Sequence, residues 1–333
     1  MIILVDKSLP YVNELVGIEG DIIFYDSLLT LSYSPNVTAL ICRSTALLTA
    51  DILNKFPALL YVFTASSGSD HLPIALLQEK GIAYFDAKGA NAHAVTDYIQ
   101  AILATLITNQ LFKPKKICIL GMGYVGQAVY QRLRQLDFDV DGYDPYMPAF
   151  SEHFLQKITS ANMLLLHANL HHQAPFPSYH LINQAILSKL QPNTCIVNAG
   201  RGELVDESAI LGFDTIHYVT DVFANEPYIN ADIIKKSWLV TPHIAGHSIE
   251  AKKAIMKVLS EKLHHLMGIP FKQKECHNER IRIHPENWLK ETMQWYNPLI
   301  ESNLLKLSST VDETFMALRK AHTFRHEITL TTK

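Results

Sequence analysis

The feature that most constrains the fold of this chain is a regular alternation of short apolar runs with helical patterns. Apolar runs of four to six residues predict buried strands, and longer segments with an apolar residue at every third or fourth position predict helices. Buried strands that alternate with helices are typical of a parallel sheet covered on both faces. The alternation therefore predicts an α/β protein.

Two such series follow one another. The predicted strands of the first series are Ile2–Val5, Ala39–Cys42, Leu60–Phe63 and Ile82–Phe85. A long helical stretch, Ala92–Gln110, separates them from the predicted strands of the second series, which are Ile117–Leu120, Val140–Tyr143, Met163–His167, Cys195–Asn198, Tyr218–Asp221 and Leu239–Thr241. Two Rossmann-like, doubly wound lobes with a cleft between them are expected, with ligands beyond the carboxyl ends of the strands.

Composition narrows the function classes. The 333 residues carry a net charge of −3 without a long basic run, which disfavours a nucleic-acid partner. No segment approaches the roughly 18 uninterrupted apolar residues that span a bilayer, and the first residues do not form a signal peptide. The four cysteines form no CxxC pair, and Cys118 and Cys195 lie inside strand-like runs. A reduced, cytoplasmic protein is expected.

A glycine fingerprint, Gly121-Met-Gly123-Tyr-Val-Gly126, lies between a predicted strand and a predicted helix, Tyr124–Leu136. In this context the three glycines allow a tight turn, close approach of a pyrophosphate and close packing of helix on strand. Asp144 follows at the end of the next strand, where its carboxylate can bind the adenosine ribose and repel a 2′-phosphate. The pattern predicts an NAD site and disfavours NADP.

Three motifs downstream supply groups suited to oxidising a hydroxy acid. Arg201 in Asn198-Ala-Gly-Arg-Gly offers a planar fork for a carboxylate. His243 in Thr241-Pro-His-Ile-Ala-Gly-His is the candidate base, because an imidazole titrates near neutrality. Glu226 in Asp221-Val-Phe-Ala-Asn-Glu-Pro is the candidate carboxylate that orients His243. Together they predict an oxidoreductase that acts on a CH–OH group.

These motifs resemble those of the D-2-hydroxyacid dehydrogenase family, and residues 1–267 fit that family throughout. The resemblance implies Arg201, Glu226 and His243 as catalytic residues and Asp221 as a contact to the nicotinamide end of NAD. Beyond the glycines and Asp144, it implies cofactor contacts at Tyr124, Val125, Ala168, Ala199, Gly200, Arg201 and Gly246. The implied substrate-binding residues are Arg43, Ser44, Ser66 and His247.

Three stretches, residues 5–11, 173–181 and 313–320, resemble one subfamily that oxidises a phosphorylated hydroxy acid, 4-phospho-D-erythronate, and has a C-terminal dimerisation module. The chain departs from these relatives at Ala168, where a threonine is usual, and at His247, where the subfamily has tyrosine. The departures leave open a sibling enzyme acting on another acid, such as 3-phosphoglycerate or glycerate. A non-catalytic NAD(H)-sensing protein is a further alternative.

The expected domains are a substrate-binding lobe at 1–92 with the helix at about 249–268, and an NAD-binding lobe at 93–248. After residue 269 the pattern becomes polar, with a strand at Arg280–Ile283, helices at Trp288–Asn297 and Val311–His322, and a strand at Glu327–Leu330. Residues 269–333 are predicted to form a small α+β module that makes a homodimer.

The sixteen histidines raise the question of a metal, especially at His167, His171 and His172 or at the pair His264-His265. Adjacent histidines point to different sides of a regular element, and no cysteine or carboxylate set completes a zinc pattern. No metal is expected. The residues that would bind a substrate phosphate stay open between Arg43, Lys7 and Lys88.

Overall fold

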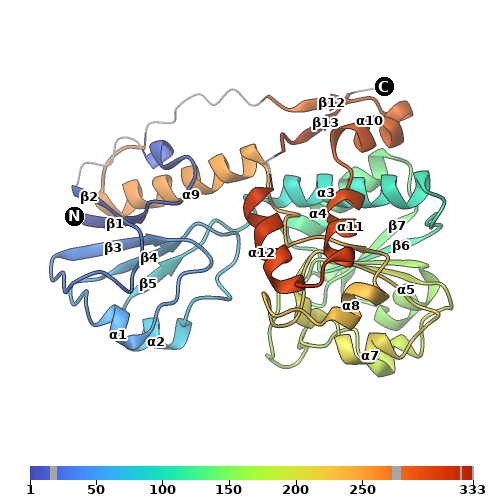
Figure 1. Cartoon of the computed structure of the whole chain (residues 1–333), viewed down its shortest axis with the longest axis horizontal. Helices are drawn as coiled ribbons and strands as arrows, with labels where there is room; N and C mark the ends of the chain where they lie inside the picture. The colour runs from blue at the N-terminus through green and yellow to red at the C-terminus, as the bar shows by residue number, and fades with distance from the viewer. Residues whose placement is uncertain (16–20, 272–278, 323–324, 332–333) are drawn as a thin grey trace. The chain divides into compact units, whose positions relative to one another are not determined.

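The computed structural model describes residues 1–15, 21–271, 279–322 and 325–331. The chain divides into two compact units. Unit 1 consists of Met1–Asn91 and Ser248–Asn278, and unit 2 of Ala92–His247 and Glu279–Lys333 (Figure 1). The C-terminal residues thus group with the second sheet rather than forming a unit of their own.

Unit 1 is built on a five-stranded parallel sheet in the order β2-β1-β3-β4-β5. Its strands are β1 (Ile2–Asp6), β2 (Asp21–Tyr25), β3 (Val37–Cys42), β4 (Tyr61–Thr64) and β5 (Ala83–Phe85). Helices α1 (Ala50–Leu53) and α2 (Ile74–Glu79) cover one face. The 3₁₀ helix η1 (Val12–Leu15) and helix α9 (Ile249–Met267) cover the other.

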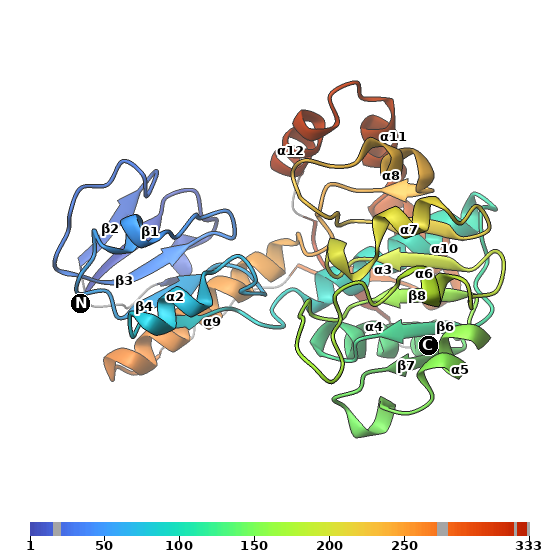
Figure 2. The ribbon, with the colours of Figure 1, turned by 90° about the horizontal axis from the view of Figure 1, so that it is seen from below.

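Helix α9 follows the strands of the second sheet in the sequence but belongs to unit 1. Its first turn is capped by the Ser248 side chain, which accepts the Ala251 N–H at 2.9 Å, and Gly268 ends the helix in the left-handed conformation. The buried side chains of α9 pack on β1 and β3, and Figure 2 shows the helix, in orange, along this sheet. A helix distant in sequence therefore completes the core of unit 1.

Unit 2 contains a six-stranded parallel sheet in the order β11-β10-β9-β8-β6-β7. Its strands are β6 (Ile117–Leu120), β7 (Val140–Tyr143), β8 (Met163–Leu166), β9 (Cys195–Asn198), β10 (His217–Thr220) and β11 (Leu239–Val240). The chain places β7 and β8 on opposite sides of β6, so the carboxyl end of β6 is the switch point where nucleotides bind in such sheets.

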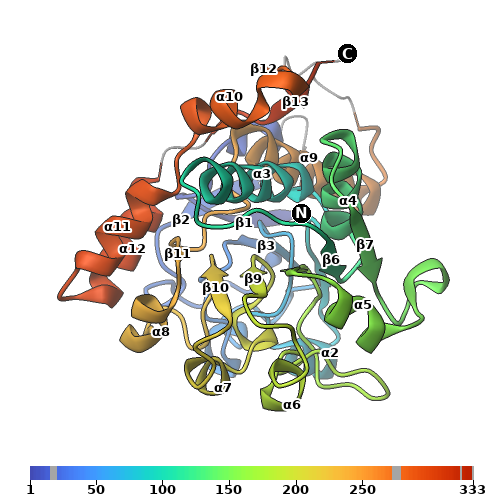
Figure 3. The same cartoon turned by 90° about the vertical axis from the view of Figure 1, so that its right-hand side faces the viewer.

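Helices cover both faces of this sheet, as Figure 3 shows. Helices α3 (Ala92–Thr108) and α4 (Tyr124–Gln135) lie on one face. The helices of the other face are α5 (Phe154–Ser160), α6 (Gln184–Leu187), α7 (Glu207–Leu211) and α8 (Ala231–Lys236). Along β6, Ile117 and Ile119 join one cluster while Cys118 and Leu120 join the other. This two-sided burial explains the continuous apolar runs of the sequence.

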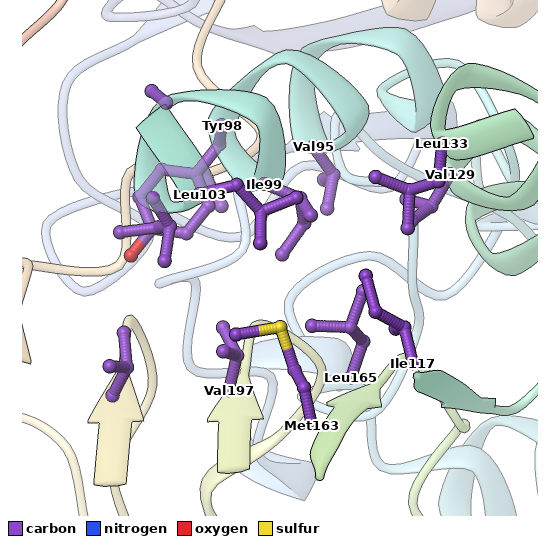
Figure 4. Close-up of a cluster of buried hydrophobic side chains, with 14 of the residues drawn as sticks. Val95, Tyr98, Ile99, Leu103, Ile117, Val129, Leu133, Met163, Leu165 and Val197 are labelled. Carbon is purple, nitrogen blue, oxygen red and sulfur yellow. The ribbon is translucent and has the colours of Figure 1, made fainter. Parts of the chain in front are cut away.

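The first cluster is centred on α3, whose side chains point toward the strands in Figure 4. Val95, Ile99 and Leu103 pack against side chains such as Leu165 and Val197. Most residues of α3 are buried, which agrees with the long helix predicted over Ala92–Gln110.

The described C-terminal residues form a parallel strand pair, a 3₁₀ helix and three α-helices. The elements are β12 (Ile281–Ile283), η4 (Pro285–Asn287), α10 (Trp288–Trp295), α11 (Leu299–Leu307), α12 (Val311–Ala321) and β13 (Ile328–Leu330). A buried polar network joins this segment to α3 and α4. Arg132 binds Asp97 at 2.8 Å, and Asp97 accepts the Ile328 N–H at 2.7 Å.

The predicted α/β class with two parallel sheets is confirmed. All the strands predicted from apolar runs exist, with ends that differ by at most two residues. The edge strand β2, where Ile23 and Phe24 are half exposed, and helix α11 are not among the predicted elements. None of the helices in the described part of the chain combines the length and apolar character needed to cross a membrane.

Candidate active site

The glycine-rich turn connects β6 to α4 with the expected geometry. Gly121 has φ +94°, and a side chain there would collide with the backbone of Ala168. A Cβ on Gly126 would collide with the Gly121 carbonyl, so this glycine permits the close packing of helix on strand. The space around Gly123 is open to at least 4 Å, which leaves room for a phosphate at the start of α4.

Asp144 fixes the edge of this turn. One carboxylate oxygen accepts the Met122 N–H at 2.9 Å and the other accepts the Tyr146 N–H at 3.0 Å. Each oxygen keeps a second lone pair, so the carboxylate can still accept hydrogen bonds from ribose hydroxyls. Asp144 therefore ties the glycine-rich turn to the end of β7 and presents the group predicted to bind the ribose.

A cavity of about 530 Å³ opens beside Asp144, at the carboxyl ends of β6, β7 and β8. Gly121 and Ala168 line its inner end, and Phe176 contributes to its aromatic wall, edge-on to Tyr146 with ring centroids 5.9 Å apart. Its position and its mixed polar and apolar lining fit the adenosine half of a dinucleotide. The residues present thus fit NAD.

The loop after β9 carries Arg201. Buried Asn198 holds this loop, because its side-chain amide donates to the Arg201 carbonyl at 2.9 Å and its amide oxygen accepts the Gly200 N–H at 3.2 Å. Arg201 itself donates from Nη1 to the Gly200 carbonyl at 2.9 Å. The bonds of Asn198 thus fix the backbone conformation of Ala199–Arg201. All three of these residues are predicted to bind the cofactor.

Glu226 and His243 form a direct pair. The Nδ1–H of His243 donates to Oε2 of Glu226 at 2.7 Å, and Oε1 of Glu226 accepts the Phe223 N–H at 3.0 Å. Because Nδ1 carries the proton in this bond, Nε2 carries the lone pair of the neutral ring. The His243 side chain is 34 % exposed and the Glu226 side chain 18 %. The geometry is that of a base with an oriented ring.

The pKa of Glu226 is lowered. Burial alone would raise the pKa of this carboxyl, but the charge and hydrogen bond of His243, the Phe223 N–H and the charge of Arg319 outweigh it. Glu226 is therefore ionised at neutral pH and can stabilise the His243 ring once the ring has taken a proton.

Asp221 shapes the loop that carries His243. Its carboxylate, 1 % exposed, accepts the Thr241 hydroxyl at 2.7 Å, the Ile244 N–H at 2.8 Å and the Ala245 N–H at 2.9 Å. Thr241 in turn accepts the hydroxyl of Tyr98, on α3, at 2.7 Å. Burial raises the pKa of Asp221, although the charge of His243 opposes the shift. The nicotinamide contact of Asp221 stays a prediction.

The substrate-side residues lie in two places. In unit 1, Arg43 follows β3, and its Nε contacts buried Asp6 at 3.1 Å while its side chain is half exposed. Ser44 is the next residue, and Ser66, after β4, accepts the Gly68 N–H at 3.4 Å. His247 belongs to unit 2, in the turn that begins at Ile244 and also contains Gly246.

His167 lies directly after β8 rather than at its end. Both ring nitrogens are buried without a hydrogen-bond partner among the described residues, and burial lowers the pKa of this ring to about 3. His167 is neutral. Within residues 1–15, 21–271, 279–322 and 325–331, no group of three or more His, Cys, Asp or Glu is arranged to hold a metal ion.

The polar partners that hold the site leave no recognisable pattern in the sequence. Tyr98 carries no motif, and Thr241 stands in the histidine motif without any sign of its bond to Asp221. The buried Asp97–Arg132 pair was also unforeseen. Only the tertiary structure brings these residues together.

Comparison with known proteins shows the family of the chain. Residues 97–245 match the model of the family "D-isomer specific 2-hydroxyacid dehydrogenase, NAD binding domain". The chain is 40% identical over 296 residues to the erythronate-4-phosphate dehydrogenase of Legionella pneumophila subsp. pneumophila, covering 87% of this chain and 84% of the relative. It is 34% identical over 261 residues to that of Coxiella burnetii strain RSA 493, covering 75% and 70%.

Solved structures show the same fold at low identity. The NAD complex of the NAD-dependent formate dehydrogenase of Staphylococcus aureus superposes with a TM-score of 0.65 at 21% identity, covering 82% of this chain and 97% of that one. The NAD⁺-bound 3-phosphoglycerate dehydrogenase of Entamoeba histolytica gives 0.67 at 18% identity, covering 80% and 95%.

Proposed function

Because the chain belongs to the family of D-isomer specific 2-hydroxyacid dehydrogenases and is an NAD-dependent oxidoreductase, we propose that it oxidises 4-phospho-D-erythronate. The products are 2-oxo-3-hydroxy-4-phosphobutanoate, NADH and a proton. The observation that carries the chemistry is the 2.7 Å bond between His243 and Glu226. The substrate is supported by the relatives named erythronate-4-phosphate dehydrogenase at 40% and 34% identity.

In this proposal His243 removes the proton of the C2 hydroxyl through Nε2, and Glu226 stabilises the resulting imidazolium. Arg201 binds the substrate carboxylate and the oxygen that becomes the carbonyl, since a guanidinium fork matches two oxygens at once. Bound NAD supplies an acceptor for the hydride of C2. The charge balance is complete, because the proton and the hydride leave the same alcohol.

The proposed cofactor contacts follow the glycine-rich turn and the strand ends. Asp144 would bind the adenosine ribose and Gly123 would face the pyrophosphate. The remaining positions proposed are Gly121, Tyr124, Val125, Gly126, Ala168, Ala199, Gly200, Arg201, Asp221 and Gly246. Ala168 offers no hydroxyl, so at this position only its backbone and methyl group can contact the cofactor.

We propose a substrate-binding role for unit 1, through Arg43, Ser44 and Ser66, and for His247 of unit 2. The half-exposed guanidinium of Arg43 is suited to an anionic group, and its contact with Asp6 holds it in place. Lys7 and Lys88 remain alternatives for the phosphate.

A homodimer formed through the C-terminal residues is also proposed. Ile300, Leu304 and Leu307 on α11 and Met316 on α12 are large apolar side chains that are 46 to 86 % exposed. Exposed apolar residues gathered on neighbouring helices are typical of interaction surfaces. A cytoplasmic location is supported by the free, buried thiols of Cys42, Cys118 and Cys195.

The test is a substrate panel in which NADH formation is followed by absorbance, with a carbonyl trap to remove the product. The panel contains 4-phospho-D-erythronate, 3-phosphoglycerate and D-glycerate. The proposal expects the highest kcat/KM for 4-phospho-D-erythronate. Preference for another acid would assign the chain to a sibling activity, which the departures at Ala168 and His247 keep open. Tight NADH binding without turnover of any acid would indicate a sensing protein.

A further inference from the structure

A second cation contacts the catalytic carboxylate, and it comes from the C-terminal helices. Nη1 of Arg319, on α12, lies 3.6 Å from Oε2 of Glu226. The same oxygen accepts the Nδ1–H of His243 at 2.7 Å. The Arg319 side chain is 25 % exposed, so water only partly screens this interaction. Glu226 therefore shares one oxygen between the proposed base and a fixed positive charge.

Helix α12 is held against the Glu226 loop on both sides of that residue. Asp312, in the first turn of α12, accepts the Ile229 N–H at 3.0 Å. Phe315 is fully buried and packs edge-on against Phe223, with ring centroids 5.9 Å apart. Ile229 lies three residues after Glu226 and Phe223 three residues before it. These two anchors fix the distance between Arg319 and the carboxylate.

The same C-terminal segment also contacts the loop of His243. Arg325, which is 9 % exposed, donates from Nη2 to the carbonyls of Ile244 at 3.0 Å and Ala245 at 3.3 Å. Its guanidinium lies over the ring of Tyr296, 4.2 Å from the ring centroid. Both partners of the Glu226–His243 pair thus sit on loops that the C-terminal residues support.

Two carboxylates among the described residues also interact with the pair. Glu207, on α7, accepts the Ala224 N–H at 3.1 Å and interacts electrostatically with Glu226. Asp221, at the end of β10, interacts electrostatically with His243. Arg319, on α12, is a cation that contacts Glu226 beside these two carboxylates.

We propose that Arg319 is a positioning residue through which the C-terminal helix shares the charge of Glu226 and sets the pH range in which His243 acts as a base. This inference rests on the catalytic roles proposed above for Glu226 and His243. The sign follows from the charges. A cation at Oε2 offsets part of the negative charge that Glu226 presents to the protonated His243 ring, so removal of Arg319 leaves more of that charge to the ring, which then keeps its proton to higher pH.

The experiment measures kcat/KM for NAD-dependent oxidation against pH in the full-length protein. In Arg319→Gln the acidic limb of the kcat/KM profile should move to higher pH by about half a unit. A shift of this order is expected for the loss of one partly screened charge in contact with Glu226. Arg319→Lys keeps the charge and should return most of the shift. Lys320→Gln is the matched control, because it removes an exposed positive charge from the next position of the same helix and should behave as wild type.

A double variant shows whether Arg319 acts through Glu226. In a Glu226→Gln background, Arg319→Gln should shift the limb much less than it does alone. Arg319→Met, which keeps the aliphatic volume, replaces Arg319→Gln if that variant fails to fold. An unmoved acidic limb in a folded, active charge-removal variant overturns the inference. Absence of turnover by the wild type on every acid of the panel overturns the proposed function instead.

Discussion

Unit 1 and unit 2 each bury an aspartate at the carboxyl end of a parallel strand, and the two aspartates bind different partners. Asp6, the last residue of β1, is 2 % exposed. One of its oxygens accepts the Ser8 N–H at 2.9 Å and the Ser8 hydroxyl at 2.6 Å, and the other binds the half-exposed guanidinium of Arg43 at 3.1 Å. Asp221, directly after β10, is 1 % exposed and accepts hydrogen bonds from the Thr241 hydroxyl and two backbone amides. The carboxyl end of a parallel strand thus supports an ion pair in unit 1 and the hydrogen bonds of a loop in unit 2.

The partners of each aspartate indicate the role of each strand end. In unit 1 the buried carboxylate holds a cation near the surface, which suits the binding of an anionic substrate group. In unit 2 the buried carboxylate organises a backbone loop, and that loop places His243 on Glu226. Binding and chemistry are therefore expected to respond to different substitutions.

Substitution of His243 should produce the largest effect. In His243→Ala, kcat/KM should fall by about 10²- to 10⁴-fold, because the general base is lost. Steady-state assays of NADH formation measure it. His265→Ala, which removes an exposed imidazole from α9, is the matched control and should retain activity. Normal turnover by His243→Ala would remove the base from the proposal.

Asp221→Asn should destabilise unit 2. The amide of an asparagine replaces one acceptor oxygen with a donor that faces a backbone N–H or a hydroxyl, at a cost of about 1–3 kcal/mol. Urea unfolding, compared with wild type, measures the loss. A variant as stable as wild type would show that the loop does not depend on this carboxylate, and the contrast with Asp6 would fail.

Arg43→Ala should raise the KM of the phosphorylated acid by about tenfold and change kcat less, because one charged contact to the substrate is lost. Lys7→Ala and Lys88→Ala, measured beside it, test the other two cations considered for the phosphate. If kcat falls as far as in His243→Ala, the division between binding in unit 1 and chemistry in unit 2 is wrong.

The effect of Glu226→Gln on stability should be the smallest of these changes, and it should depend on pH. A carboxyl with a lowered pKa stabilises the fold above its ordinary pKa, and that contribution is lost as pH falls through the lowered value. Wild type should exceed Glu226→Gln in unfolding free energy by about 1 kcal/mol at neutral pH. The denaturant midpoints of wild type and Glu226→Gln should converge as the pH falls from neutral to acidic. A difference in unfolding free energy that stays constant over this pH range would contradict an ionised Glu226.

The amino-acid pattern alone predicted most of the strands, the nucleotide turn and a candidate catalytic set. Strands buried on both faces must be apolar throughout, and a turn that a Cβ would block must contain glycine, so both leave a local signal at Gly121 and Gly126. The motifs placed Arg201, Glu226 and His243 after strand ends because parallel strands in such folds deliver side chains there.

The hydrogen-bond and ion-pair partners of the polar side chains are known only from the tertiary structure. The bonds of Tyr98 to Thr241 and of Asp221 to the His243 loop, and the approach of Arg319 to Glu226, join residues from separate elements. Periodicity reports which face of an element is buried, but it carries no information about the partner of a single polar atom. That partner depends on strand order and helix packing, which are set by the whole chain.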